Sequence, residues 1–227
     1  MKTNFKNATE AFEYLYDEIM EQWIDFAWTK ALFNIWFYVK NSTDRIITTP
    51  FRQFNDKYAL REWAWYESQD KNAEEISKFA PIWKNHMNEK WEVNSNYWNQ
   101  VNREWQWEYV KEKLKQKDNR HWVLTIYDWK EHKEYWNDTP CTLALHFQVI
   151  ENELCMSVMM RSNDLWFWYS VDQYCFSKFQ EKMAYELWIK IWWMYHFATN
   201  LHIYERHWNM KDKYLQSTEK SINILTN

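Results

Sequence analysis

The chain has 227 residues, 26% charged residues and a formal net charge of −4. This length fits one domain with a full hydrophobic core, and we expect a single domain over residues 1–227. The acidic balance argues against a nucleic-acid partner, and no run of about 18 apolar residues predicts a membrane span. We therefore expect a cytoplasmic protein, and the spacing of its cysteines and histidines predicts neither disulfides nor a metal site.

The composition is abnormal in two residue types, because the chain has no glycine and 19 tryptophans. Average glycine usage of about 7% would give roughly 16 glycines in a chain of this length. Glycine normally supplies the positive-φ positions of turns and helix ends, so other residues must occupy them here. The pattern indicates a sequence that was altered or selected to avoid glycine.

Hydrophobic periodicity predicts mostly helices in the first half of the chain. Apolar residues at three- and four-residue spacing over 10–39 predict a helix that leads into a strand. The segment 44–55 predicts a short strand interrupted by a proline. Residues 57–83 predict one or two helices that end at Pro81, and 103–120 predicts another helix with a charged outer face.

Strands are more frequent in the second half. The alternating run 121–129 predicts a strand, and 142–164 predicts a β-hairpin with its turn near 151–153. A long amphipathic helix is expected over 172–195, followed by a strand and a helix over 196–208. Because helices and strands mix without repeated βαβ units, we expect an α+β fold.

Cys141 lies directly before the first strand of the predicted hairpin. A lone cysteine at such a place is most often a small buried hydrophobe. Four other chemically capable side chains accompany it along the chain: Glu62, Arg161, His202 and Tyr204. Arginine favours a thiolate and binds phosphate, and a histidine–tyrosine pair suits a sugar hydroxyl. From the residues alone, Cys141 is either a core residue or a nucleophile.

Several motifs together resemble one enzyme family. The sequences TPC at 139–141, RSND at 161–164 and LHIYERH at 201–207 have the order and spacing of thymidylate synthases and the related phage deoxycytidylate hydroxymethylases. REWAWY at 61–66, PIWKNHMNEKWEVNSNYW and KDNRHWVLTIY match the upstream pattern of that family. The resemblance covers about residues 55–210. It implies a thymidylate-synthase-like fold whose mixed β-sheet, flanked by helices, forms a homodimer interface.

The resemblance also implies the reaction. Cys141 would add to C6 of a pyrimidine nucleoside monophosphate, and C5 would then take a one-carbon unit from 5,10-methylenetetrahydrofolate. Glu62 would manage proton transfer through ordered water. The product would be either a methyl or a hydroxymethyl pyrimidine. The C-terminal SINILTN does not match the short apolar tail that closes over folate in the synthases, which favours addition of water over hydride transfer.

The remaining matched positions would bind the two substrates. Arg161 and Ser162 would bind the 5′-phosphate, and His202 and Tyr204 would bind the sugar hydroxyl. Asp164 would accept a hydrogen bond from the pterin ring, and Trp83 would lie against the folate. Arg120 resembles the arginine that crosses the dimer interface to the other subunit's phosphate. The family usually has a second arginine beside it, and this chain departs from that pattern with His121.

Asp172 bears on which pyrimidine is bound. The synthases have asparagine at this position, which suits the N3–H and O4 of uracil, whereas the hydroxymethylases have aspartate. A protonated aspartate can donate to N3 of cytosine and accept from its 4-amino group, and an apolar pocket raises the pKa toward that form. The alternative is that Asp172 caps the following helix. We expect conversion of dCMP to 5-hydroxymethyl-dCMP, with dUMP methylation as the first alternative.

Trp91, Trp98 and Trp168 fall where relatives have glycine. Trp168 lies between the residues expected to bind phosphate and those expected to read the base, where a bulky side chain restricts the backbone. Misplacement of a reacting group by about 1 Å can cost roughly 10²-fold in rate. The second alternative is therefore an impaired variant that keeps the fold without the chemistry.

Overall fold

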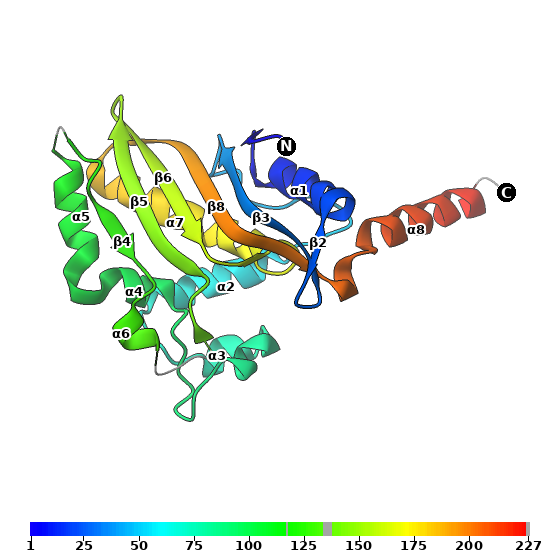
Figure 1. Ribbon diagram of the computed structural model, residues 1–227, viewed down its shortest axis with the longest axis horizontal. Coiled ribbons are helices and arrows are strands. Elements are labelled where there is room, and N and C mark those ends of the chain that lie inside the picture. The colour runs from blue at the N-terminus through cyan, green and yellow to red at the C-terminus, as the bar shows by residue number, and fades with distance from the viewer. Residues whose placement is uncertain (117, 134–137, 226–227) are drawn as a thin grey trace.

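The computed structural model describes residues 1–116, 118–133 and 138–225. Its centre is a mixed sheet of eight strands in the order β1-β3-β8-β6-β5-β4, with β2 beside β3 and β7 beside β8 (Figure 1). This arrangement confirms the α+β class with a mixed sheet. The strands are β1 (Asn4–Phe5), β2 (Ile24–Phe26), β3 (Thr29–Val39), β4 (Val123–Thr125), β5 (Thr142–Ile150), β6 (Glu153–Met160), β7 (Asn163–Asp164) and β8 (Lys190–Tyr204).

Helices cover one face of this sheet, with α7 along its middle (Figure 1). None of the described helices is both long enough and apolar enough to cross a membrane. The α-helices are α1 (Ala8–Gln22), α2 (Asp56–Glu67), α3 (Glu74–Ser77), α4 (Tyr97–Asn102), α5 (Gln106–Leu114), α6 (Trp129–His132), α7 (Tyr169–Leu187) and α8 (Met210–Leu225). The 3₁₀-helices are η1 (Pro81–Asn85), η2 (Arg103–Trp105) and η4 (Glu205–His207).

The opposite face of the sheet carries no helix in Figure 1. Aromatic side chains of β3 and β8 contact one another on this face. Trp36 of β3 stacks on Tyr195 of β8 with ring centroids 6.2 Å apart. Tyr38 contacts Trp193 and Tyr195 at 5.1 and 5.2 Å. Burial alternates along β3, so Phe37 and Val39 enter the core while Trp36 faces outward.

Most of the N-terminal prediction is confirmed, since 10–39 forms α1, β2 and β3. The strand predicted over 44–55 is wrong. Thr9 of α1 donates its hydroxyl to the Ile46 carbonyl at 3.1 Å and accepts the Thr48 amide at 3.1 Å, so a side chain replaces a neighbouring strand. Pro81 does not end a helix but begins η1, where its missing N–H and fixed φ are tolerated.

In the second half, the hairpin β5–β6 and the helix α5 are confirmed, although Lys117 lies outside the described residues. The run 121–129 contributes only the short strand β4. The helix predicted over 172–195 starts earlier and ends at Leu187, because Trp188 takes a left-handed φ of 58° and the next residues enter β8. Short apolar runs such as 189–195 fit either a helix or a strand.

Candidate active site

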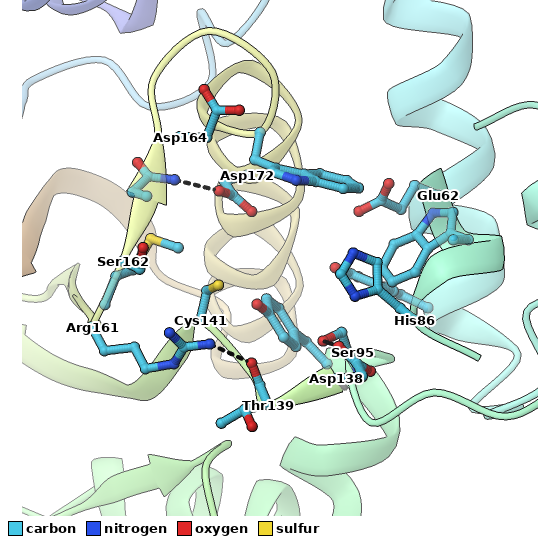
Figure 2. Close-up of a pocket in the computed structure, with 16 residues that line it drawn as sticks. Glu62, His86, Ser95, Asp138, Thr139, Cys141, Arg161, Ser162, Asp164 and Asp172 are labelled. Carbon is cyan, nitrogen blue, oxygen red and sulfur yellow. Dashed lines mark hydrogen bonds between the residues drawn. The ribbon is translucent and has the colours of Figure 1, made fainter. Parts of the chain in front are cut away.

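A cavity of about 540 Å³ lies where α2, η1, the segment before β5, the β6–β7 connection and the start of α7 meet (Figure 2). Its volume is within the range of about 300–1,000 Å³ that is typical of small-molecule sites. Seven of the residues expected from the sequence line it: Glu62, Trp83, Cys141, Arg161, Ser162, Asp164 and Asp172. They come from distant parts of the chain, so the fold gathers most of the predicted site.

Cys141 lies at the cavity wall in a fixed backbone position. Its carbonyl accepts the Arg161 amide at 2.9 Å, which ties the start of β5 to the RSND segment. The side chain of the preceding Asp138 accepts from the Ser95 amide at 2.8 Å and the Ser95 hydroxyl at 2.6 Å. This buried carboxylate anchors the loop that carries Cys141, and no motif in the sequence pointed to it.

The Cys141 thiol is half-buried and free of disulfide bonds. Burial raises its pKa to about 11, and Asp172 adds to that shift, although the Arg161 guanidinium opposes it. The residue therefore rests as a thiol at neutral pH and must lose its proton before it can attack. Cys141 lines the cavity close to Arg161, so it is placed where a ligand could reach it.

Glu62 lies on the inward face of α2 and is buried. The Tyr58 hydroxyl donates to its carboxylate, and the Trp83 indole N–H donates to Tyr58 Oη at 2.9 Å. Burial raises the pKa of Glu62 to about 7, while hydrogen bonds from Tyr58 and Tyr66 hold it down. A carboxyl group with this pKa can both give and take a proton near neutrality.

Asp172 is inside the first turn of α7 and does not cap it. The helix N-cap is Trp168, which makes no side-chain cap, and the Asp172 amide already donates to the Trp168 carbonyl at 2.8 Å. The carboxyl oxygen Oδ2 accepts from Asn163 Nδ2 at 2.7 Å. Burial, reinforced by nearby Glu62, raises the pKa of Asp172 well above its ordinary value. The capping alternative is wrong, and Asp172 is a carboxyl group of raised pKa in the cavity wall.

Asp164 closes the turn between β7 and α7. Its side chain accepts the amides of Trp166 and Phe167 at 2.9 and 3.2 Å, and burial raises its pKa to about 6. Strand β7 also pairs with the part of β8 that contains His202. The RSND and LHIYERH segments are therefore neighbours in the sheet.

The Arg161 side chain donates hydrogen bonds to nearby backbone carbonyls. Its Nε donates to the Pro140 carbonyl at 3.0 Å. Its Nη2 donates to the Thr139 carbonyl at 2.7 Å (Figure 2). A guanidinium has five N–H donors, and these bonds occupy two of them. Ser162 follows it in the cavity wall. The cation is thus oriented by backbone carbonyls while donors remain for an anion.

Three predicted residues are not part of the cavity lining over the described residues: His202, Tyr204 and Arg120. His202 is buried, shares a hydrogen bond with Asn200 at 2.7 Å, and its pKa is lowered to about 4 by burial. Tyr204 is 38% exposed. Arg120 pairs with Asp118 at 3.1 Å and keeps 70% of its side chain exposed. The expected sugar and inter-subunit contacts are therefore not assembled in this single chain.

The three tryptophans at expected glycine positions differ in backbone conformation. Trp91 has a φ of 64°, which favours glycine, but Trp168 has a φ of −89° and Trp98 is buried within α4. Trp168 lines the cavity and meets Trp83 edge-on at 5.4 Å. Trp168 therefore takes up space in the cavity but does not strain the backbone.

Several lining residues were missed by sequence reasoning. They are Tyr66, His86, Ser95, Tyr97, Asp138, Thr139, Met160 and Asn163. Asn163 and Thr139 lie inside quoted motifs, so a closer reading of RSND and TPC could have found them. Tyr66, His86, Ser95 and Tyr97 also lie inside the quoted upstream motifs, but nothing in those motifs singles them out. Asp138 and Met160 lie outside the quoted motifs, and only packing brings them to the cavity.

Comparison with known proteins supports the same family. The family model for thymidylate synthase matches residues 25–226. The deoxycytidylate 5-hydroxymethyltransferases of Enterobacteria phages T4, T2 and T6 are each 27% identical to this chain over 194 residues, which is 76% of this chain and 76% of each relative. The family match covers the cavity and almost the whole sheet.

Proposed function

Because this chain belongs to the thymidylate synthase family, we propose that it transfers a one-carbon unit from 5,10-methylenetetrahydrofolate to C5 of dCMP and releases 5-hydroxymethyl-dCMP. The family supports one-carbon transfer to a pyrimidine nucleotide. The relatives named deoxycytidylate 5-hydroxymethyltransferase support the finer choice of substrate and product.

Asp172 is the observation that carries the choice of cytosine. Burial raises the pKa of Asp172 well above its ordinary value, which favours the neutral carboxyl. A neutral carboxyl can donate to the N3 acceptor of cytosine and accept from the 4-amino group with its other oxygen. Uracil presents N3–H and O4 at the same edge, so the same carboxyl would face the wrong pattern. A site built for one hydrogen-bonding pattern rejects the other strongly.

The residues in the cavity fit a flat base and a second ring system. Trp83 and Trp168 provide aromatic surfaces, and Asp164 is a carboxyl group that can accept from a pterin N–H. When bound, methylenetetrahydrofolate supplies a carbon at the oxidation level of formaldehyde. Trp83 and Asp164 would orient it beside the nucleotide.

The chain's own residues account for the covalent chemistry. The Cys141 thiol gives up its proton and Sγ forms a bond to C6, which places electron density on C5. After C5 has gained the carbon unit, it would lose its proton while the bond from that carbon to the folate nitrogen breaks. Tetrahydrofolate would leave, and an exocyclic methylene would remain on C5. Water then adds to the exocyclic carbon, and the Sγ–C6 bond breaks to restore the thiol. Glu62, whose pKa is near neutral, handles the protons at the base and at water.

A homodimer would complete the phosphate end of the site. The helix-free face of the sheet exposes Trp36, which is 42% accessible. Exposed aromatic surface of this kind is typical of association interfaces. In such a dimer Arg120, whose guanidinium pairs with Asp118, would reach the nucleotide phosphate of the other subunit.

Tritium release tests this proposal. The protein is incubated with [5-³H]dCMP or [5-³H]dUMP and methylenetetrahydrofolate, and the product is identified. We expect release from dCMP with a hydroxymethyl product. Release mainly from dUMP with a methyl product would instead support the synthase. No release from either would support the impaired variant, for which Trp168 in the cavity is the relevant observation.

A further inference from the structure

One buried polar atom in the cavity wall lacks a hydrogen-bond partner beside the base-reading carboxyl. Asn163 is only 2% exposed, and its Nδ2 donates to Asp172 Oδ2 at 2.7 Å. Its Oδ1 is buried and has no partner within the described residues. A buried acceptor left unpaired is unfavourable, and because Asn163 lines the cavity, a bound ligand can supply the missing donor.

Cytosine offers the donor that this acceptor lacks. Its 4-amino group has two N–H donors, and Asp172 can accept only one of them while it donates to N3. Uracil has the acceptor O4 at the same place, so the Asn163 oxygen would face another acceptor. The same amide also fixes Asp172, because the bond to Oδ2 makes that oxygen an acceptor and leaves the proton to Oδ1.

Resting on the proposed function, we propose that Asn163 is a second specificity-determining residue, which accepts the second N–H of the cytosine 4-amino group. Asn163 and Asp172 then read one amino group together. Asn163 is held on β7, and β7 is paired with β8, so the amide is presented from a rigid element. Discrimination against uracil follows from attraction to the amino group and from repulsion of O4.

The test compares wild type with Asn163→Leu, which keeps the shape, and with Asn163→Ala. The assays measure kcat/KM for dCMP, dUMP and N4-methyl-dCMP, whose amino group has only one N–H. We expect Asn163→Leu to lower the dCMP-to-dUMP ratio of kcat/KM at least tenfold. We also expect the wild-type preference for dCMP over N4-methyl-dCMP to shrink in Asn163→Ala. Circular dichroism and thermal melts check that both variants fold.

The outcomes separate this inference from the function on which it rests. A wild type that prefers dUMP contradicts the proposed function itself. A wild type that prefers dCMP, with an unchanged dCMP-to-dUMP ratio in both folded variants, overturns only the role of Asn163. If the ratio falls but the preference over N4-methyl-dCMP stays unchanged, Asn163 merely positions Asp172, and the direct contact is refuted.

A second inference rests on the backbone. Four tryptophans have left-handed φ angles between 58° and 64°: Trp28, Trp91, Trp105 and Trp188. Such angles are unusual for bulky residues and ordinary for glycine. These side chains are 88%, 51%, 80% and 85% exposed, and none donates an indole hydrogen bond within the described residues. In contrast, buried Trp83 and Trp107 both donate to named partners.

A chain with no glycine but with tryptophan at glycine-type turns has a simple genetic explanation. We infer that one of the codons translated as tryptophan in this sequence is read as glycine by the gene's own host. The native protein would then carry glycine at these four positions. Tandem mass spectrometry of the protein from that host tests this. Peptides spanning positions 28, 91, 105 and 188 are expected to contain glycine, and those spanning 83 and 107 tryptophan. Tryptophan at all six positions would overturn the inference.

Discussion

The two ends of the cavity differ in how far this single chain completes them. At the base-reading end, Glu62 and Asp172 are buried and held by named hydrogen bonds. At the phosphate end, Arg161 points its guanidinium at backbone carbonyls and Arg120 is largely exposed. The side chains at the base-reading end are fixed without a ligand, whereas those at the phosphate end have donors left for an anion.

The physical cause of this difference is the cost of burying charge. Glu62 and Asp172 can be preorganised without a ligand because their raised pKa values allow them to be buried in neutral form. Arginine cannot lose its charge in this way, and an arginine cluster buried without an anion would be strongly destabilising. Under the proposed function, base recognition can therefore be built into one chain, whereas phosphate binding would be completed on association.

The largest expected effect follows from removing the nucleophile. Cys141→Ser should lower tritium release from dCMP by roughly 10⁴-fold or more, because no other group can form the bond to C6. Cys155→Ser is the matched control, since Cys155 is buried in β6 outside the cavity lining. Equal activity in both variants would remove Cys141 from the chemistry.

Changing the base reader should exchange the substrates. Asp172→Asn replaces an acid with an amide that suits uracil, and we expect the dCMP-to-dUMP ratio of kcat/KM to fall by roughly 10²- to 10³-fold. Steady-state assays on both nucleotides measure this ratio. A loss of both activities in equal proportion would show that Asp172 supports the fold without reading the base.

The buried acids at the base-reading end should make stability depend on pH. The pKa of Glu62 rises from 4.5 to about 7 on folding, so its stabilising contribution is complete below about pH 4.5 and is lost as pH rises through about 7. Glu62→Gln lacks this loss. The difference in free energy of unfolding between Glu62→Gln and wild type should therefore shift by roughly 3 kcal/mol in favour of the variant from pH 4 to pH 8, at about 1.36 kcal/mol per pKa unit.

Urea unfolding at several pH values measures this gain. Glu67→Gln, at the exposed end of the same helix, is the matched control and should follow the wild-type profile. Parallel profiles for wild type and Glu62→Gln would contradict the assignment of a neutral buried carboxyl.

The phosphate end should depend on the partner subunit. Arg120→Ala should lower kcat/KM for dCMP about tenfold or more, since a charge-assisted contact to phosphate is lost. Mixing it with inactive Cys141→Ser should restore roughly a quarter of wild-type activity, because half of randomly mixed dimers contain one intact site. No recovery in mixtures shown to exchange subunits would place Arg120 outside the site.

The smallest effect concerns a turn far from the cavity. Trp188 ends α7 with a left-handed φ of 58° and is 85% exposed. Trp188→Gly should raise the free energy of unfolding by about 0.5–1 kcal/mol, because relief of backbone strain outweighs the added freedom of the unfolded chain. Thermal melts measure this. Trp129→Gly, within α6, should destabilise, and stabilisation by both would contradict the strain argument.

Much of the fold could be predicted from the sequence where local pattern and packing agree. The hairpin β5–β6 and α1 follow from alternation and from helical periodicity. The strand predicted over 44–55 failed because its backbone bonds to Thr9 of α1, a contact that no local pattern shows. The late end predicted for α7 failed because apolar residues after Trp188 belong to β8.

The site could be predicted only as far as motifs carry it. Cys141 and Asp172 lie in motifs quoted from the sequence, and both line the cavity. Asp138 was missed because its role is to accept hydrogen bonds from Ser95, which is distant in the chain. His202 and Tyr204 lie in a matching motif but outside the cavity lining, since a motif fixes a position on β8 and not its contacts.

The most direct test of the account is covalent trapping. The protein is incubated with methylenetetrahydrofolate and either 5-fluoro-dCMP or 5-fluoro-dUMP, and the adduct is mapped by peptide mass spectrometry. We predict a stable adduct on Cys141, because fluorine at C5 cannot leave as a proton does. We expect this adduct to form faster with 5-fluoro-dCMP than with 5-fluoro-dUMP. No adduct on Cys141, or one formed only with 5-fluoro-dUMP, would contradict the central claim that Cys141 attacks the base and that the cavity selects cytosine.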